Sequence, residues 1–511
     1  MNALKSAYTV AAGLAGCLLT AGLAATPGVA ETPVKGGTLQ VGLETDARGF
    51  DAVEGGVLGQ SAATVTNTIH DTLINYAPDG SNSPRLALSW TTSDDLKSWT
   101  FKLREGITFH DGTPFTATDV AHHYNRILDP KNKSRSRSFI SPIKEAVVVD
   151  DHTVRFILKH PWLPFLPFMG SRQAMSGPIP SHKNVEAGKQ NREPVGTGPF
   201  RFVSWAGGDR IVVERNEDYW DKDRVNLDKI VFRIMPDTQT RYASLKSGEV
   251  DVIWTDRGNT IVRAKKDPDI TTLTAEGAGA LIGITNTRKP PLDDPRVRAA
   301  ISHALNQQVT IDVTWKGTVP FITHPYRGHY DCGDAGYRHY DPEKAKALLA
   351  DYGKPVQVSM IHTTTPRGRE LGEVSQQLLK KVGIELVLEP VDQNTLVKRV
   401  FTKDFEMSGW RIADGADIGP QIFGLNHSES SYNLTGYTDP EMDKLVVAQR
   451  ISTDKVERGK MLCTIATMIN ESGHIRYGGG RRYHVFTRNN VKGIPTIWSG
   501  IADLSSAWIE N

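Results

Sequence analysis

Histidines are the side chains of this 511-residue chain best suited to metal binding or proton transfer, and fifteen are present. His122 and His123 are the one adjacent pair, and neighbouring helix positions point about 100° apart, so such a pair rarely shares a metal. His110 lies in a turn just before Gly112, where a role in the turn is the simpler interpretation. We therefore expect neither a metal site nor a cofactor.

Sequence motifs typical of catalysis and nucleotide binding are missing. The chain has no G-x-x-x-x-G-K-[ST] loop, no G-x-G-x-x-G opening a helix, no H-E-x-x-H and no G-x-S-x-G. Acidic pairs occur, as in any chain of this length, but none has a context suited to acid–base catalysis. The sequence favours a protein that is not an enzyme, and a secreted hydrolase is the alternative from another class.

The elements that must position the functional residues can be read from hydrophobic periodicity. Residues 38–43 and 96–103 predict strands, and residues 116–128 predict a helix that opens with a capping-box-like Thr116 and Asp119. In the second half of the chain a run of alternating helices and strands follows, with helices over 341–353 and 370–382 and strands over 356–360 and 384–388. Such a run is typical of an α/β fold with parallel strands.

The first thirty residues resemble a secretory signal. Lys5 gives a weakly positive start, residues 8–23 are almost wholly apolar or small, and small residues before Ala30 suit a signal peptidase. Cleavage after Ala30 is preferred, and a lipid anchor on Cys17 is the alternative. The remaining cysteines, Cys332 and Cys463, could form a disulfide or stay as thiols, and both options are open.

The charge balance argues against a polyanionic partner. Sixty Lys and Arg residues against 58 Asp and Glu residues leave a formal net charge of +2, and basic runs such as Arg481-Arg482 are short. We expect these runs to form solvated surface and the protein not to bind nucleic acid. After residue 30 no segment approaches the ~20 uninterrupted apolar residues that a membrane span needs.

Two segments identify a family. Residues 99–120 read W-T-F-K-L-R-E-G-I-T-F-H-D-G-T-P-F-T-A-T-D-V, and residues 194–220 contain G-T-G-P-F followed by E-R-N and Y-W. Both closely resemble family 5 of the extracellular solute-binding proteins, the periplasmic dipeptide-, oligopeptide- and nickel-binding group. Residues 286–300 and 341–349 are weaker matches in the expected order.

The resemblance implies a type II periplasmic-binding-protein fold: two α/β lobes joined by a hinge, with an extra domain on the first lobe. Mapped by order, the expected parts are a signal peptide (1–30), lobe I (31–70, 190–283 and 482–511), the extra domain (71–189) and lobe II (284–481). Gly478, Gly479 and Gly480 fall at the expected second crossing, where glycine could provide hinge freedom or simply form a turn.

In peptide-binding relatives, a carboxylate after a Gly-Trp pair in lobe II meets the ligand's α-ammonium. Asp414 is the best match here, but it stands one residue further from Trp410 than expected, so Asp417 competes with it. Arg411 is unusual beside the tryptophan and could hold a carboxylate through two hydrogen bonds, while Trp410 could form a wall of the site. Alternatively, Arg411 points to solvent and Trp410 belongs to the core.

Further ligand candidates lie elsewhere in the chain. Glu44 and Asp46 follow the first strand, and Gln60 follows soon after, whereas Arg135 and Arg137 could form a basic edge.

The resemblance implies the receptor of an ABC importer, a monomer in the periplasm that hands its ligand to membrane permease subunits. A short peptide or related zwitterion is the leading ligand, and an anionic metal chelate or an opine is the alternative. A folding or chemotaxis partner that uses the same cleft is a further rival.

Overall fold

The structure is a computed structural model and describes residues 32–54, 60–77, 80–171, 176–326, 330–412, 417–495, 497–498 and 500–510. The expected signal peptide, including Cys17, lies outside the described residues. None of the helices in the described part combines the length and hydropathy needed to cross a membrane.

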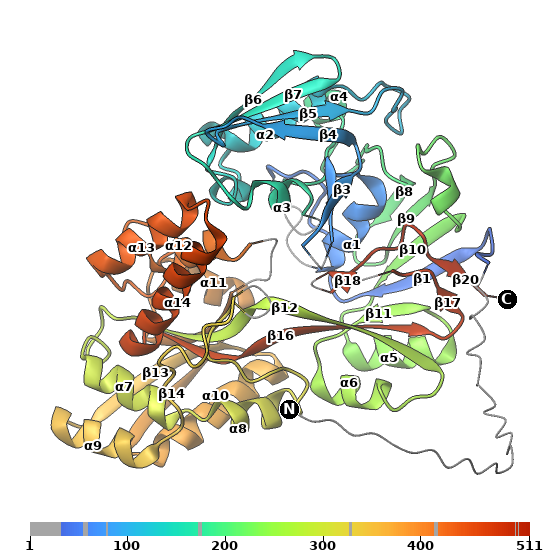
Figure 1. Ribbon diagram of the computed structural model, residues 1–511. Helices are drawn as coiled ribbons and strands as arrows, with labels where there is room; N and C mark the ends of the chain where they lie inside the picture. The colour runs from blue at the N-terminus through green and yellow to red at the C-terminus, as the bar shows by residue number, and fades with distance from the viewer. Residues whose placement is uncertain are drawn as a thin grey trace, which may run out of the picture.

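One mixed ten-stranded sheet runs through the molecule, in the order β14-β13-β15-β12-β16-β11-β1-β10-β9-β8. Its central strands, β12 (Ile270–Thr285) and β16 (Ile475–Arg488), are long and pair antiparallel with each other, as the crossing ribbons in Figure 1 show. Near one end β12 also pairs with β15, and near the other β16 also pairs with β11. These two strands therefore connect two halves, which we call lobe I (the side of β11 to β8) and lobe II (the side of β13 to β15).

Lobe I is built around a parallel pair of strands. β1 pairs in parallel with β10 on one side and with β11 on the other, whereas β9 and β8 extend the sheet antiparallel. Its elements are β1 (Thr38–Leu43), α1 (Gln60–Ile69), β8 (Phe200–Ala206), β9 (Arg210–Arg215), β10 (Lys229–Ile234), α5 (Thr238–Ser247), β11 (Val252–Trp254), α6 (Gly258–Ala264) and the short C-terminal strands β17 (Val491–Lys492), β18 (Ile497–Trp498), β19 (Ile501–Ala502) and β20 (Trp508–Ile509).

Lobe II repeats the parallel arrangement, because β13 pairs in parallel with both β14 and β15. This confirms the predicted strand-helix-strand unit. The elements are α7 (Pro295–Ala304), α8 (Gln307–Thr314), α9 (Pro342–Tyr352), β13 (Val356–Thr363), α10 (Pro366–Lys380), β14 (Ile384–Val391), α11 (Gln393–Phe401), β15 (Met407–Ile412), α12 (Gly419–Asn426), α13 (Pro440–Ile451) and α14 (Lys455–Ser472).

A separate antiparallel sheet, β4-β5-β7-β6, forms the body at the top of Figure 1. Helix α2 packs against it, and Phe101, Tyr124 and Phe156 are fully buried between them. Its elements are β2 (Ile74–Tyr76), β3 (Asn82–Pro84), β4 (Ala87–Thr92), β5 (Ser98–Leu103), α2 (Ala117–Leu128), β6 (Ile143–Asp150), β7 (Thr153–Leu158), α3 (Phe165–Met169) and α4 (His182–Glu186), with short 3-10 turns at Pro130–Asn132, Arg135–Ser138 and Lys222–Arg224.

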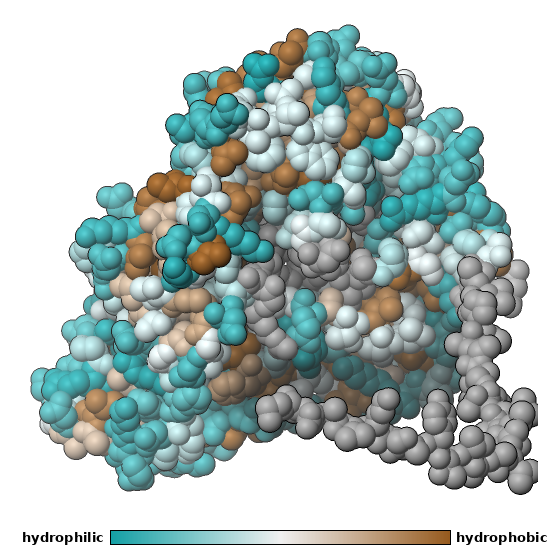
Figure 2. Space-filling view, viewed as in Figure 1, coloured by the Kyte–Doolittle hydropathy of each residue, from teal (hydrophilic) through white to brown (hydrophobic). Residues whose placement is uncertain are grey.

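The buried apolar residues form separate clusters for the two lobes. One cluster joins Leu39 of lobe I to Phe101 of the top body, and the clusters of lobe II contain only residues between Ala280 and Tyr477. On the face seen in Figure 2, hydrophilic residues predominate and apolar residues lie in small groups. The predicted α/β architecture is confirmed, and the domain boundaries proposed from the sequence remain predictions.

The glycines of the expected crossing lie inside β16, where the β12–β16 register shifts. Gly479 has a φ of 147°, and a Cβ on Gly480 would lie 2.8 Å from Pro320 Cγ and 2.9 Å from Ile322 Cγ2. Close packing against the loop after α8 therefore accounts for glycine at 480, because a side chain there would collide. The hinge role of this segment remains a prediction.

Local signals placed most helix ends correctly. Thr116 caps α2, and its backbone N–H donates to Asp119 Oδ2 at 2.9 Å, which confirms the capping box. The second helix of the α/β unit differs, because α10 begins at Pro366, four residues before the predicted start. Thr365 is its cap, and the apolar stripe that marked the helix in the sequence does not reach its first turn, which contains Gly368.

Cys332 and Cys463, for which the sequence left both states open, form a disulfide. The bond ties α14 to the loop that precedes α9 and closes a sequence separation of 131 residues.

Candidate ligand-binding site

Charged side chains of both lobes follow the carboxyl ends of parallel strands. Glu44 follows β1, Asp256 follows β11, and Arg367 stands at the start of α10, just after β13. In open α/β sheets ligands bind outside the carboxyl ends of the strands, because helix starts and loops gather there. The two lobes direct these ends toward each other.

An ion pair joins the lobes at this point. The Arg367 guanidinium of lobe II donates a short hydrogen bond to Asp256 Oδ2 of lobe I, and Arg257 Nε lies 3.7 Å from Asp256 Oδ1. Burial opposes the ionisation of Asp256, but the charges of Arg367 and Arg257 outweigh it and hold the Asp256 pKa below its ordinary value.

Arg411 enters the same region from β15, where it pairs with Leu281 of β12. Burial lowers its pKa, and the guanidinium of Arg481 lowers it further, with a smaller contribution from Arg367. The side chain nevertheless keeps an exposed surface, and no described carboxylate forms an ion pair with it. Arg411 is thus a partly desolvated cation that no carboxylate in the described part of the chain neutralises.

Arg481 corrects one expectation from the sequence. The Arg481-Arg482 run was expected to form solvated surface, but Arg481 Nε donates to Tyr483 Oη at 3.0 Å, and its charge acts on both Arg411 and Asp256. We call Glu44, Asp256, Arg257, Arg367, Arg411 and Arg481 the interlobe cluster.

Trp410 lies beside this cluster and is partly buried against the core of lobe II. Its Nε1 donates to Tyr432 Oη at 3.1 Å, and its ring meets Phe401 edge-on at 6.2 Å. The fixed indole can form a wall of the site next to Arg411. Its packing on the core of lobe II also agrees with the alternative that Trp410 is a core residue.

Glu44 and Gln60 come together in lobe I, as part of the lining of a cavity of about 20 Å³ that also includes Trp254. Burial raises the pKa of Glu44, and the negative charge of Asp256 adds to this effect. Arg241 Nη2 lies 3.9 Å from Glu44 Oε2 and acts in the opposite sense.

Two other candidate carboxylates already have protein partners. Asp46 accepts hydrogen bonds from Trp205 Nε1 at 3.0 Å and from the Gly208 N–H at 2.8 Å, so it secures the β8–β9 hairpin. Asp417 forms two 2.7 Å hydrogen bonds with the buried Arg458.

The remaining candidates contribute less. Asp414 lies outside the described residues, and so does the side chain of Arg135. Arg137 is exposed on the top body beside a separate cavity of about 300 Å³.

Sequence reasoning missed Asp256, Arg257, Arg367, Arg481 and Trp254. A positional signal was available for two of them, since Asp256 closes the strand-like V-D-V-I-W-T-D and Arg367 follows the strand predicted over 356–360. Arg481 could not be found this way, because only the pairing of β16 with β12 brings it between the lobes.

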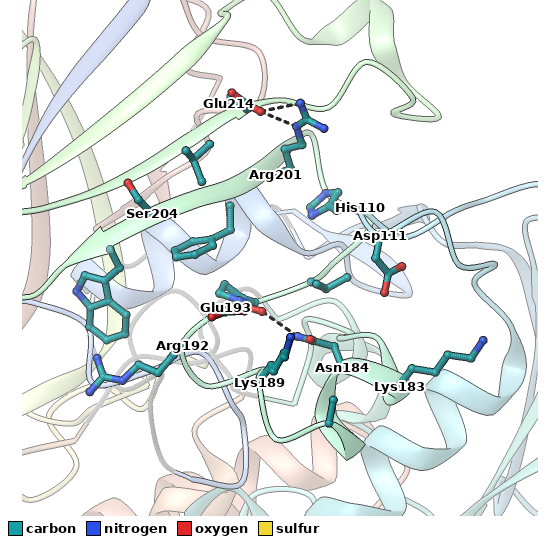
Figure 3. A pocket seen from close by; sticks show the side chains of 16 residues that line it. His110, Asp111, Lys183, Asn184, Lys189, Arg192, Glu193, Arg201, Ser204 and Glu214 are labelled. Carbon is teal, nitrogen blue, oxygen red and sulfur yellow. Dashed lines mark hydrogen bonds and ion pairs between the residues drawn. The ribbon is translucent and has the colours of Figure 1, made fainter.

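A larger cavity, of about 960 Å³, lies between α4 and the β8–β9 hairpin (Figure 3). Three of its charged side chains are engaged: Arg201 Nε donates to Glu214 Oε1 at 2.7 Å, and the Arg192 guanidinium lies 4.2 Å from the Trp205 ring centre. It shares no lining residue with the interlobe cluster. Within the described ranges, no three His, Cys, Asp or Glu side chains are grouped so that they could hold a metal ion.

Two α/β lobes joined by long strands, with opposed charges between them, define a two-lobed solute-binding protein. The chain belongs to the bacterial extracellular solute-binding proteins of family 5, whose "Middle" model matches residues 82–433. The members are non-catalytic binding proteins of transporters, and this chain is the solute-binding protein of an ABC importer.

Relatives named for different ligands share the fold. Heme-binding protein A of Haemophilus influenzae is 29% identical over 442 residues, covering 79% of this chain and 80% of that protein. The structure of DppA from Helicobacter pylori in complex with the peptide STSA matches with a TM-score of 0.81 at 26% identity, covering 94% of this chain and 99% of that one. The structure of AgaA from A. tumefaciens R10 in complex with agropinic acid matches with a TM-score of 0.80 at 29% identity, covering 93% of this chain and 99% of that one.

Proposed function

We propose that this protein captures a small solute bearing at least one carboxylate between its lobes, and that Arg411 binds that carboxylate. The observation that carries the proposal is a desolvated guanidinium with an exposed surface and no ion-pair partner among the described carboxylates. A planar guanidinium can donate two parallel hydrogen bonds to a carboxylate, and such bonds strengthen where water is excluded.

The charge of the interlobe cluster favours an anionic ligand over a simple dipeptide. Among the described residues, its four guanidiniums face two carboxylates, and one of these, Asp256, is already paired with Arg367. The α-ammonium of a peptide would be repelled by this excess of positive charge. An opine or an anionic metal chelate therefore fits this cluster better than a short peptide does. The short peptide remains the leading ligand predicted from the sequence.

Delivery follows from the class of protein. We propose that the closed form docks, as a monomer in the periplasm, on the permease subunits of the importer. Closure is favoured only by the extra contacts that the ligand makes in the closed state, so a ligand held by Arg411 and by groups of lobe I is the kind that would drive it.

A ligand panel tests the proposal. Opines, metal–EDTA chelates and dipeptides would be compared by thermal shift and by calorimetry on the wild-type protein and on Arg411→Met, with Arg210→Met as control. Arg210 is exposed and pairs with its neighbour Asp209 on the β8–β9 hairpin. A ligand at 100 times its dissociation constant stabilises the folded state by about 2.7 kcal/mol.

We expect an anionic member to bind the wild type and the Arg210 variant alike, and to bind the Arg411 variant about 100-fold more weakly, since a charged hydrogen-bonded pair is lost. Equal binding to the Arg411 variant would refute the proposed role, and tight binding of neutral peptides alone would refute the anionic class.

A further inference from the structure

Three polar side chains without a hydrogen-bond partner meet at one small cavity of lobe I. Trp254 Nε1 is buried and donates to no described acceptor. Neither the Glu44 carboxyl nor the Gln60 amide forms a side-chain hydrogen bond within the described ranges. Buried polar groups are nearly always paired, so the open Trp254 donor indicates that another molecule completes it. The half-buried side chains of Glu44 and Gln60 border the same space and can bind that molecule too.

The chemistry of these groups selects what can enter. Trp254 Nε1 is only a donor, so it requires an acceptor, and the Glu44 carboxylate requires a donor. An ammonium group would satisfy Glu44 but would oppose the Trp254 N–H and the guanidinium of Arg241, 3.9 Å from Glu44. A carboxylate would satisfy Trp254 but would be repelled by Glu44. A neutral group that both donates and accepts hydrogen bonds satisfies both Trp254 Nε1 and the Glu44 carboxylate.

The size of the cavity further restricts which chemical group can fill it. Its volume of about 20 Å³ exceeds the ~10–15 Å³ that one water molecule needs, but leaves little room beyond one oxygen-sized group. Apolar side chains, among them Val41, Leu43 and Val485, form much of the remaining lining. A hydroxyl group has the right size and carries one donor and two acceptor positions.

We propose that Glu44, Gln60 and Trp254 form a subsite for a hydroxyl group of the ligand, so that the transported solute is a hydroxylated carboxylate. The inference rests on the proposed function, because Arg411 of lobe II holds the carboxylate while this subsite holds the hydroxyl from lobe I. Because each lobe binds one end of the ligand, only a ligand of the right length with a carboxylate and a hydroxyl favours closure of the lobes.

Matched carboxylates test the subsite. Calorimetry would compare D-gluconate and 6-hydroxyhexanoate with hexanoate, which lacks the hydroxyl, and with 6-aminohexanoate, which carries an ammonium instead. A site built to hydrogen-bond a hydroxyl strongly rejects the analogue without it, and we expect at least a ~10-fold preference for a hydroxylated member.

Two variants assign the preference to these residues. Trp254→Phe removes the Nε1 donor and Glu44→Gln removes the carboxylate with little change in size, and each should reduce the preference to within about twofold. Trp99→Phe is the matched control, because Trp99 Nε1 is also buried without a partner but belongs to β5 of the top body. This variant should keep the wild-type preference.

The outcomes separate this inference from the proposed function. If hexanoate binds as tightly as the hydroxylated compounds, while Arg411→Met weakens both, the subsite is refuted and the carboxylate site stands. If the preference survives in both the Trp254 and the Glu44 variants, the cavity holds only water and the inference fails. If no hydroxylated compound binds, the inference fails. If, in addition, Arg411→Met leaves the affinity for every ligand of the first panel unchanged, both proposals fail.

Discussion

Arg367 and Asp256 form an ion pair between residues that are far apart in sequence and belong to different lobes. Arg367 stands at the first turn of α10 in lobe II, and Asp256 follows β11 in lobe I. A second contact joins lobe II to the top body, where Arg450 Nη2 of α13 donates to Ser141 Oγ at 3.0 Å. Lobe II thus contacts both lobe I and the top body without a ligand.

Asp256→Asn should shift the ligand-free protein toward an open form. The substitution removes the charge that holds Arg367, and partly exposed pairs of this kind contribute about 1 kcal/mol, enough to change the balance of two states about fivefold. Small-angle X-ray scattering should show a larger radius of gyration than in the wild type.

Glu214→Gln serves as the control for this experiment, because its ion pair with Arg201 lies within lobe I. It should leave the radius unchanged. An unchanged radius for Asp256→Asn as well would show that the ion pair does not hold the lobes together.

Asp417→Asn should destabilise the protein without abolishing ligand binding. Asp417 and Arg458 are joined by two hydrogen bonds of 2.7 Å, and Arg458 is also held by Gln449 and Tyr330. Removing one partner leaves a buried guanidinium uncompensated, which typically costs about 3–5 kcal/mol. Chemical denaturation would measure the loss.

The double variant Asp417→Asn with Arg458→Met should recover part of the stability, since no charge is then left unpaired. A ligand affinity that falls about 100-fold in the folded single variant would contradict this structural role and assign Asp417 to the ligand site.

Sequence patterns were sufficient for the elements and their ends wherever the signal is local. Asp341 and Pro342 start α9 and Gly353, with a φ of 76°, ends it, because caps and left-handed glycines act within a few residues. The start of α10 was misplaced because its first turn has no apolar residue beyond Pro366 and contains Gly368, which is required by a contact with Thr363 that only the fold creates.

The candidate site was only partly predictable for the same reason. Arg411 was found from its place beside Trp410, but its importance comes from Arg481 and Arg367, which the crossing strands bring near it. Asp46 had the right chemistry and position in the sequence, yet the β8–β9 hairpin takes both of its carboxylate oxygens. Sequence identifies which residues could bind, and tertiary contacts decide which of them remain available.

Reduction of the Cys332–Cys463 disulfide should lower the stability of lobe II. A cross-link over a sequence separation of 131 residues restricts the unfolded chain, and loops of this size correspond to about 5 kcal/mol, although measured values are often nearer 2–4. Calorimetry with and without a reductant should show a lower Tm on reduction. A Cys332→Ser, Cys463→Ser variant should match the reduced protein and show no further response to reductant, and an unchanged Tm would contradict the prediction.

Buried histidines should make the protein sensitive to mild acid. Burial lowers the pKa of His70 and His474 to about 3 and that of His110 and His123 to about 4. Because their folded pKa values lie below the ordinary 6.5, the stability they contribute is complete above pH 6.5 and is lost as the pH falls, when only the unfolded chain takes up protons. Each can reduce the free energy of unfolding by up to about 1.4 kcal/mol per pH unit.

His474→Gln isolates one of these contributions. His474 is fully buried, its Nε2–H donates to Asn426 Oδ1, its Nδ1 is hydrogen-bonded with Ser472 Oγ, and its ring stacks on Tyr437 at 4.3 Å, so the variant should be less stable at pH 7. Its free energy of unfolding should nevertheless fall less steeply than that of the wild type between pH 6.5 and 5. His339→Gln, at an exposed histidine that pairs with Asp334, should keep the wild-type slope. Parallel slopes for all three proteins would show that protonation of buried His474 does not contribute to acid unfolding.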